Sequence, residues 1–104
     1  MLRYKLAVFW LEAEIDTIQP EIIFCLGLIA AKTLINKNFR MREQRGKWFK
    51  YLSKIDVIAT FHPSAISRAI HTQYYDEMKK NFIHDIQAVA ERCYLENKYA
   101  TGTR

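Results

Sequence analysis

Cysteine, glycine and proline are all scarce in this sequence, and each shortage excludes a class of protein. The 104 residues include only two cysteines, Cys25 and Cys93, which stand far apart and form no Cys-x-x-Cys pair. A disulfide framework and a cysteine metal site therefore have no support, and we expect two reduced core residues in an intracellular, cytoplasmic protein. Three glycines and two prolines in a chain that is 50% hydrophobic argue against disorder.

Long apolar runs are also missing, which excludes a membrane-spanning helix and a membrane partner. The apolar run from 6 to 11 follows two basic residues, as in a signal peptide. Glu12 and Glu14 interrupt that run early, and no small-residue cleavage site follows. The length is that of one domain or of part of one.

Positive charge is present in excess, and it is concentrated in one segment. The whole chain has a net charge of +5. Between residues 37 and 54, seven basic side chains oppose the single carboxylate of Glu43, which gives a local net charge of +6: Lys37, Arg40, Arg42, Arg45, Lys47, Lys50 and Lys54. Such a patch fits a polyanionic partner such as nucleic acid, although a solvated loop and helix face is the alternative. Trp48, Phe49 and Tyr51 interleave with these charges, either as stacking platforms or as anchors to the core.

Helix and strand patterns alternate along the chain. Helical spacing predicts helices over 2–18, 27–36 and about 72–96, and short apolar runs predict strands at 21–26 and 55–61. The apolar stripe expected for the last helix consists of Tyr75, Met78, Phe82, Ile86, Val89 and Cys93. The segment 41–49 is ambiguous, and Arg40 and Arg42 would share one face of a short strand.

This alternation predicts an α/β fold. Two or three strands make a narrow sheet, whereas typical sheets have about five. We therefore expect part of a three-layer α/β/α sandwich with a short, mostly parallel sheet. Residues 1–98 would form this single portion of a domain and 99–104 a frayed tail. The open edge of such a sheet would favour self-association.

The segment 60–68, Thr-Phe-His-Pro-Ser-Ala-Ile-Ser-Arg, follows the second predicted strand and is expected to begin a loop. Ligands of open α/β sheets bind at the carboxyl ends of strands, and Pro63 restrains His62 to an extended conformation. His62 is therefore a candidate for a reacting or recognising histidine. Each residue also has a structural interpretation by itself: His62 as a hydrogen-bonded loop residue, Ser64 as a turn cap and Ile66 as a core residue.

Further motifs occur in a fixed order around this segment. The chain has IQPEII at 18–23, Leu-Gly at 26–27, Ala-Ala at 30–31, RGKW at 45–48, ATFHPSAISR at 59–68 and Asp-Ile at 85–86. In this series, from about residue 6 to about residue 95, the chain resembles the C-terminal half of a uracil-DNA glycosylase of the family 4 type. Leu-Gly and Arg-Gly are weak motifs alone, whereas the ordered series with His-Pro-Ser and a following arginine is specific.

The resemblance implies a DNA partner that contains uracil, and a catalytic role for His62. In that family the histidine of the His-Pro-Ser motif lies near uracil O2. A donor at that place stabilises the negative charge that develops when the flipped base leaves C1′. The residues implied in DNA binding are Pro63, Ser64, Ile66, Arg68, Arg45 and Lys47. Among them Ile66 would be the apolar wedge, and Pro63 and Ser64 would line the minor-groove side. Arg68 would face a phosphate or the minor groove.

Other parts of the family pattern lie upstream of the matching segment. They are the motif with the water-activating group, the aromatic that stacks on uracil and the asparagine that recognises the base edge. Family 4 also holds an iron–sulfur cluster with four cysteines. One would fall near Ala7 and the others upstream, so we expect no cluster and no other cofactor. Asp56 would lie roughly 20 Å from His62, and nothing indicates that Asp76 or Glu77 approaches it.

Three functions are compatible with this half of a site. The first is a uracil-DNA glycosylase whose N-terminal half is supplied by another polypeptide, with weak or no activity of the isolated chain. The second is a non-catalytic nucleic-acid-binding module that keeps the DNA-contacting residues and the basic patch. The third is a truncated remnant that does not fold stably alone.

Overall fold

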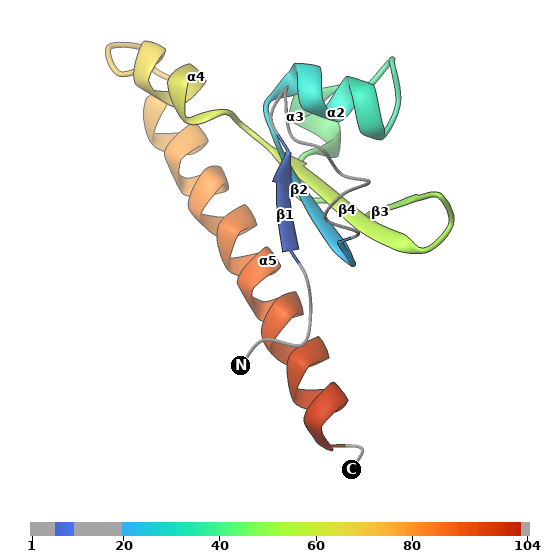
Figure 1. The fold of residues 1–104 in the computed structure, drawn as a ribbon. Coiled ribbons are helices and arrows are strands. Elements are labelled where there is room, and N and C mark those ends of the chain that lie inside the picture. The colour runs from blue at the N-terminus through green and yellow to red at the C-terminus, as the bar shows by residue number, and fades with distance from the viewer. Residues whose placement is uncertain (1–5, 10–19, 103–104) are drawn as a thin grey trace.

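The computed structural model describes the backbone of residues 6–9 and 20–102, and the side chains of Val8 and of residues 20–94 (Figure 1). The elements along the chain are β1 (Leu6–Phe9), β2 (Ile22–Leu26), α2 (Leu28–Leu34), α3 (Met41–Gln44), β3 (Phe49–Tyr51), β4 (Ile55–Thr60), α4 (Pro63–Arg68) and α5 (Tyr75–Gly102). Among the described residues, no helix combines the length and the hydrophobicity needed to cross a membrane.

The strands form a four-stranded sheet in the order β1-β2-β4-β3. β1, β2 and β4 are parallel to one another, and β3 pairs antiparallel with β4. Figure 1 shows α2 and α3 on one side of the sheet and the long helix α5 on the other. The predicted α/β fold, with helices on both faces of a short and mostly parallel sheet, is therefore confirmed.

The core consists of two apolar clusters, one on each face of the sheet. Alternate residues of β2 and β4, such as Ile23 and Val57, pack with α2 and with Phe39 on one face. Their neighbours Phe24 and Ile58 pack on the other face with Val89 of α5. This alternation is the period of two that a strand imposes, and it explains why both strands are almost continuously apolar.

The helix predicted over residues 2–18 is wrong at residues 6–9, where the chain forms β1. Leu6 to Phe9 pair in parallel with residues 22–25 of β2. Helical spacing of a short apolar run does not distinguish a helix from a buried strand, and here pairing with β2 decides. The remainder of that predicted helix lies outside the described residues.

Three further differences concern the connecting segments. The ambiguous segment 41–49 begins with the one-turn helix α3 and not with a short strand, and a hydrogen bond of 2.8 Å from the Arg40 amide to the Gln44 side chain stabilises this helix. The expected loop after His62 is the helix α4, and the last helix runs to Gly102 instead of ending near residue 96. Ile86, assigned to the apolar stripe of α5, is 40% exposed.

Candidate functional site

His62 is the second residue after β4, at the carboxyl end of the parallel strands. The register pairs Leu26 of β2 with Thr60 of β4. One residue further on, the Gly27 amide donates a hydrogen bond of 2.9 Å to the Thr60 carbonyl oxygen. The two strand ends are thus held level with each other, and His62 extends from a fixed point of the backbone.

The His62 side chain caps the first turn of α4. Its backbone is extended, with φ −73° and ψ 140°, and Pro63 takes the first helical position, where no amide is needed. The His62 Nδ1 accepts a hydrogen bond of 3.0 Å from the Ser64 amide and lies 2.8 Å from the Ser64 hydroxyl. Because Nδ1 accepts, the proton of the neutral imidazole resides on Nε2. In the part of the chain that the structure describes, Nε2 has no partner.

Gly27 makes room for this histidine. Its φ is +98°, a conformation that only glycine adopts without strain. A Cβ at position 27 would lie 3.2 Å from the His62 Cβ, closer than side-chain carbons normally approach. The Leu-Gly motif therefore serves both the turn between β2 and α2 and the close packing of that turn against His62.

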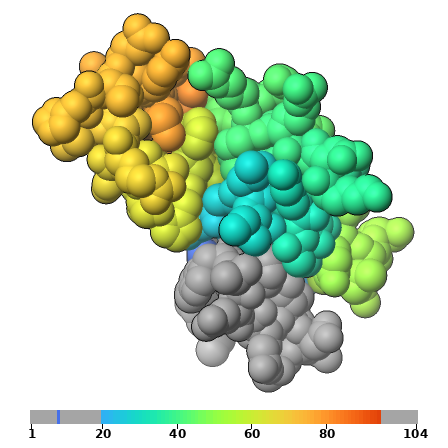
Figure 2. All heavy atoms as spheres, turned by 90° about the horizontal axis from the view of Figure 1, so that it is seen from above, coloured from blue at the N-terminus to red at the C-terminus, as the bar shows by residue number. Residues whose placement is uncertain are grey.

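A cavity of about 610 Å³, here called the histidine cavity, opens beside His62. It is lined by Leu26, Gly27, Leu28, Ile29, Ala30, Met41, Phe61, His62, Ser64, Ala65, Arg68 and Met78. Most of the lining is apolar, and none of the described residues contributes a carboxylate to it. Figure 2 views this end of the molecule and shows α4 in yellow between α2 in cyan and the start of α5 in orange. Such a cavity suits a ring held by few polar groups.

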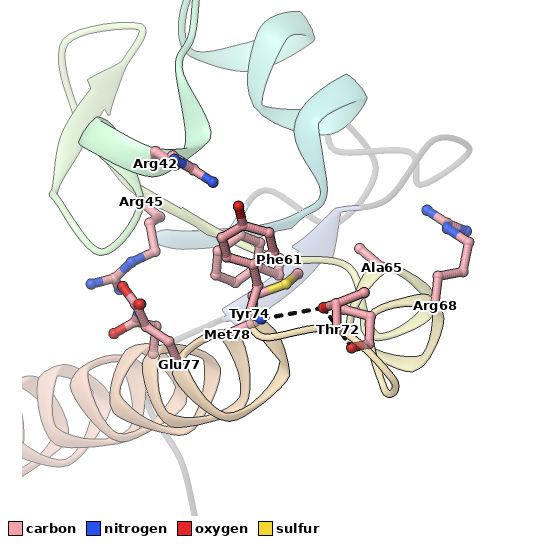
Figure 3. A pocket seen from close by; sticks show the side chains of 11 residues that line it. Arg42, Arg45, Phe61, Ala65, Arg68, Thr72, Tyr74, Glu77 and Met78 are labelled. Atoms are coloured by element: carbon pink, nitrogen blue, oxygen red, sulfur yellow. Dashed lines mark hydrogen bonds between the residues drawn. The ribbon is translucent and has the colours of Figure 1, made fainter.

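A second cavity, here called the arginine cavity, lies beside the first and has a volume of about 580 Å³. The two share Phe61, Ala65, Arg68 and Met78. Its remaining lining residues are Arg42, Arg45, Ala69, Thr72, Tyr74, Glu77 and Asn81. Figure 3 shows Arg42 and Arg45 on one side and Arg68 on the other, with Phe61, Tyr74 and Met78 between them.

Asp85 of α5 is completely buried, and it binds both Arg45 of the arginine cavity and the end of β4. Its two carboxylate oxygens accept hydrogen bonds of 2.5 Å from Arg45 and from the Thr60 hydroxyl; we call these three residues the Asp85 cluster. Gly46, with φ +75°, passes so close that a Cβ there would lie 2.6 Å from the Asp85 carboxylate. Motifs far apart in the sequence, Arg-Gly, Ala-Thr and Asp-Ile, thus meet at one buried carboxylate.

The residues predicted to bind DNA are placed around this end of the molecule, and each DNA contact stays a prediction. Pro63, Ser64 and Arg68 are exposed on α4, and Arg68 lies 3.4 Å from the Ser64 hydroxyl. Ile66 is half-buried and Lys47 is exposed, but neither lines a cavity. Arg45 is engaged with Asp85 and only 20% of its side chain is exposed, so it already has a structural role.

Within the basic segment, Lys50 and the three interleaved aromatic residues have structural partners. At the amino end of β4, Asp56 pairs with Lys50 at 2.5 Å and with Arg92 at 2.8 Å; we call these three residues the Asp56 cluster. The Arg92 guanidinium lies over the Trp48 ring, 4.1 Å from its centroid. Trp48, Phe49 and Tyr51 pack against the core clusters, as in the anchoring alternative for these aromatics.

The iron–sulfur cluster of family 4 does not fit the residues that the structure describes. Among them, no three side chains of histidine, cysteine, aspartate or glutamate converge as metal ligands. Burial of Cys25 in β2 raises the pKa of its thiol to about 12, so the thiolate that binds metal is strongly disfavoured. Burial also raises the pKa of Cys93. No chemical step is therefore assigned to a cluster.

Sequence reasoning missed three residues at this end: Asp85 as the buried carboxylate, and Arg42 and Tyr74 as lining of the arginine cavity. One signal was available for Asp85, because it stands three residues after Phe82 and four before Val89, on the face of α5 that meets the sheet. The distance in sequence between Arg42 and Tyr74 left no comparable signal.

Comparison with known proteins agrees with these motifs. Residues 5–87 match the uracil DNA glycosylase superfamily. The type-4 uracil-DNA glycosylase of Archaeoglobus fulgidus is 25% identical over 91 residues, which cover 81% of this chain and 43% of that protein. The chain thus spans less than half the length of this curated relative. Because the family match includes most of the chain, with β4, His62 and Asp85, the chain belongs to the uracil-DNA glycosylase superfamily.

Proposed function

We propose that this chain provides the histidine-bearing half of a uracil-DNA glycosylase site. In this proposal a uracil flipped from DNA enters the histidine cavity, and the His62 Nε2–H donates to uracil O2 as the N-glycosidic bond breaks. The donor acts mainly on the charge that develops in the transition state, so it lowers the barrier more than it strengthens substrate binding.

The hydrogen bonding at His62 Nδ1 is the observation that carries this proposal, because it assigns the ring proton to Nε2. Two groups of Ser64, its amide and its hydroxyl, lie within hydrogen-bond distance of Nδ1 and fix the ring with Nε2 as the donor. A neutral imidazole in this orientation donates without a prior protonation step. The cavity beside it is mostly apolar, and a low dielectric strengthens such a hydrogen bond.

The same cavity supports the proposal that a second polypeptide segment completes the site. Its described lining has no carboxylate that could activate water, and Glu77 lines the neighbouring arginine cavity instead. Among the described strands, β1 and β3 form the two edges of the sheet, and each is paired on one side only. Within the described part of the chain the outer edge of β1 has no partner, so it would offer backbone groups to a further strand, either from a separate N-terminal half or from a second copy of this chain.

The test measures uracil release from a single-stranded oligonucleotide containing uracil. The chain is assayed alone and together with the portion of the Archaeoglobus fulgidus enzyme that it does not match. We expect weak or no release by the chain alone and measurable release by the mixture.

Substitution of the histidine then tests its role. His62→Ala should lower the release rate about 100-fold, the usual effect of losing one donor to a developing oxyanion. The matched control is His71→Ala, which removes an exposed histidine that lines neither cavity. Absence of release under both conditions, or equal rates for the two variants, would contradict the proposal.

A non-catalytic nucleic-acid-binding module is the second candidate, favoured because the described lining of the histidine cavity holds no carboxylate. This function predicts binding of DNA that weakens steeply with salt, because phosphate contacts release counterions. It predicts no uracil release by the chain alone or by the mixture. The uracil-release assay therefore separates it from the first candidate.

A further inference from the structure

The arginine cavity has a composition that the chemistry at His62 does not explain. Three arginines line it: Arg42 of α3, Arg45 directly after α3, and Arg68 of α4. Thr72, Tyr74 and Asn81 are polar residues of the same lining. Arg45 is neutralised by Asp85. Arg42 and Arg68 are exposed and, in the described part of the chain, have no carboxylate partner. Glu77 is the only acidic residue in the described lining, so these residues together keep a positive charge.

Tyr74 gives this cavity an aromatic surface at a fixed position. Its side chain is 48% exposed, and the Arg42 guanidinium lies over the ring, 5.5 Å from its centroid. The Tyr74 amide donates to the Thr72 hydroxyl, which in turn donates to the Ala69 carbonyl oxygen, as part of the turn between α4 and α5. An exposed tyrosine that is held in this way beside arginines can stack a base while the arginines bind phosphate.

The position of the cavity relates it to the first one. Phe61, Ala65 and Arg68 form a common wall, so a strand that places one nucleotide at His62 has its neighbour within reach of the arginine cavity. The histidine cavity is mostly apolar, which suits a base, whereas the arginine cavity joins cations and an aromatic ring, which suits a nucleotide with its phosphate.

We propose that the arginine cavity binds the nucleotide adjacent to the flipped one in single-stranded DNA, with its base on Tyr74 and its phosphate at Arg42 and Arg68. This assignment of a substrate strand rests on the proposed function. Recognition here is independent of sequence, because every base has a face that stacks and every nucleotide has a phosphate.

The test is the affinity of the full chain for a short, fluorescently labelled oligothymidine without uracil, measured by anisotropy at several salt concentrations. Tyr74→Ala should weaken binding roughly fivefold or more, and Tyr74→Phe should bind as the wild type does, because stacking needs only the ring. Arg42→Gln should weaken binding several-fold and reduce the salt slope by about one phosphate contact.

Arg40→Gln is the matched control for Arg42→Gln. It removes the same residue type and charge two positions away, outside both cavities, and should cost about twofold or less. An oligonucleotide with abasic positions tests stacking separately, since Tyr74→Ala should have no further effect on its binding. Thermal unfolding of each variant shows whether the fold is kept, and Tyr74→Phe retains the packing of the ring.

Two results would overturn the proposal: no binding of oligothymidine by the wild type, or equal affinities of Arg42→Gln, Tyr74→Ala and Arg40→Gln. Because the probe holds no uracil, its binding is measured independently of uracil release. If the chain releases no uracil but its variants bind oligothymidine as expected, the proposed glycosylase function alone is refuted. If uracil is released but the variants do not differ in binding, the nucleotide site alone is refuted.

Discussion

β4 and α5 are joined twice, by an aspartate at each end of the strand, and the two junctions differ. At the amino end, Asp56 belongs to the strand and pairs with Lys50 and with Arg92 of the helix. At the carboxyl end the aspartate belongs to the helix, and Asp85 binds Thr60 of the strand and Arg45. α5 and β4 run in opposite directions, so the earlier helix residue Asp85 meets the end of the strand and the later residue Arg92 meets its beginning.

The difference lies in access to water and in what adjoins each junction. The Lys50 and Arg92 side chains are 61% and 31% exposed, whereas Asp85 and Thr60 are completely buried. Solvent weakens the first set of interactions and leaves the second at nearly full strength. None of the three residues of the Asp56 cluster lines either cavity, whereas Arg45 of the Asp85 cluster lines the arginine cavity and Thr60 ends the strand that leads to His62. Both junctions hold the strand to the helix, and the second also adjoins the candidate site.

The largest expected effect is that of Asp85→Ala. This change leaves Arg45 and the Thr60 hydroxyl without their partner in a buried place, which should cost about 3–5 kcal/mol of unfolding free energy. Urea unfolding followed by circular dichroism measures it. Glu91→Ala, an exposed acid on the same helix, is the matched control and should stay within about 0.5 kcal/mol. Equal stability of the two variants would show that the buried cluster contributes little.

Gly27→Ala is expected to have the next largest effect. The new Cβ would face the His62 Cβ at 3.2 Å, and its backbone would keep a φ of +98°, so strain of about 1–3 kcal/mol is expected. Uracil release or oligothymidine binding should fall further than the loss of folded protein explains, because His62 is displaced. Gly102→Ala is the control, since that glycine lies at the end of α5, far along the chain from both cavities. A Gly27→Ala variant as stable as the wild type would remove the proposed reason for the Leu-Gly motif.

The smallest effect is expected for Lys50→Ala in the Asp56 cluster. Asp56 keeps its hydrogen bond from Arg92, and the exposed lysine contributes about 1 kcal/mol or less. Its contribution should decline with salt, which thermal unfolding at low and high ionic strength would measure. Lys54→Ala removes an equally charged, exposed residue without a described partner and should have no salt-dependent effect. A loss for Lys50→Ala comparable to that of Asp85→Ala would abolish the contrast between the two junctions.

Much of the fold follows from local patterns, and the exceptions have physical causes. β2, β4, α2 and α5 were predictable because a strand buried on both faces or a long helix has a period that the sequence displays. The run at 6–9 is a strand and not the predicted helix, because four apolar residues are too few to distinguish helical from strand periodicity. The segment after His62 was expected to be a loop, although the proline at its first position is well suited to begin a helix.

The sequence by itself determined the α/β alternation, the place of His62 at a strand end and the ordered motifs of the superfamily, because these depend on spacing along the chain. The tertiary structure alone decided that Asp85 joins Arg45 to Thr60, and that Arg42 and Tyr74 face one cavity. These three contacts connect residues that are 40, 25 and 32 positions apart in the sequence. Only the packing of α5 and α3 around the sheet brings such distant side chains within hydrogen-bond or stacking distance.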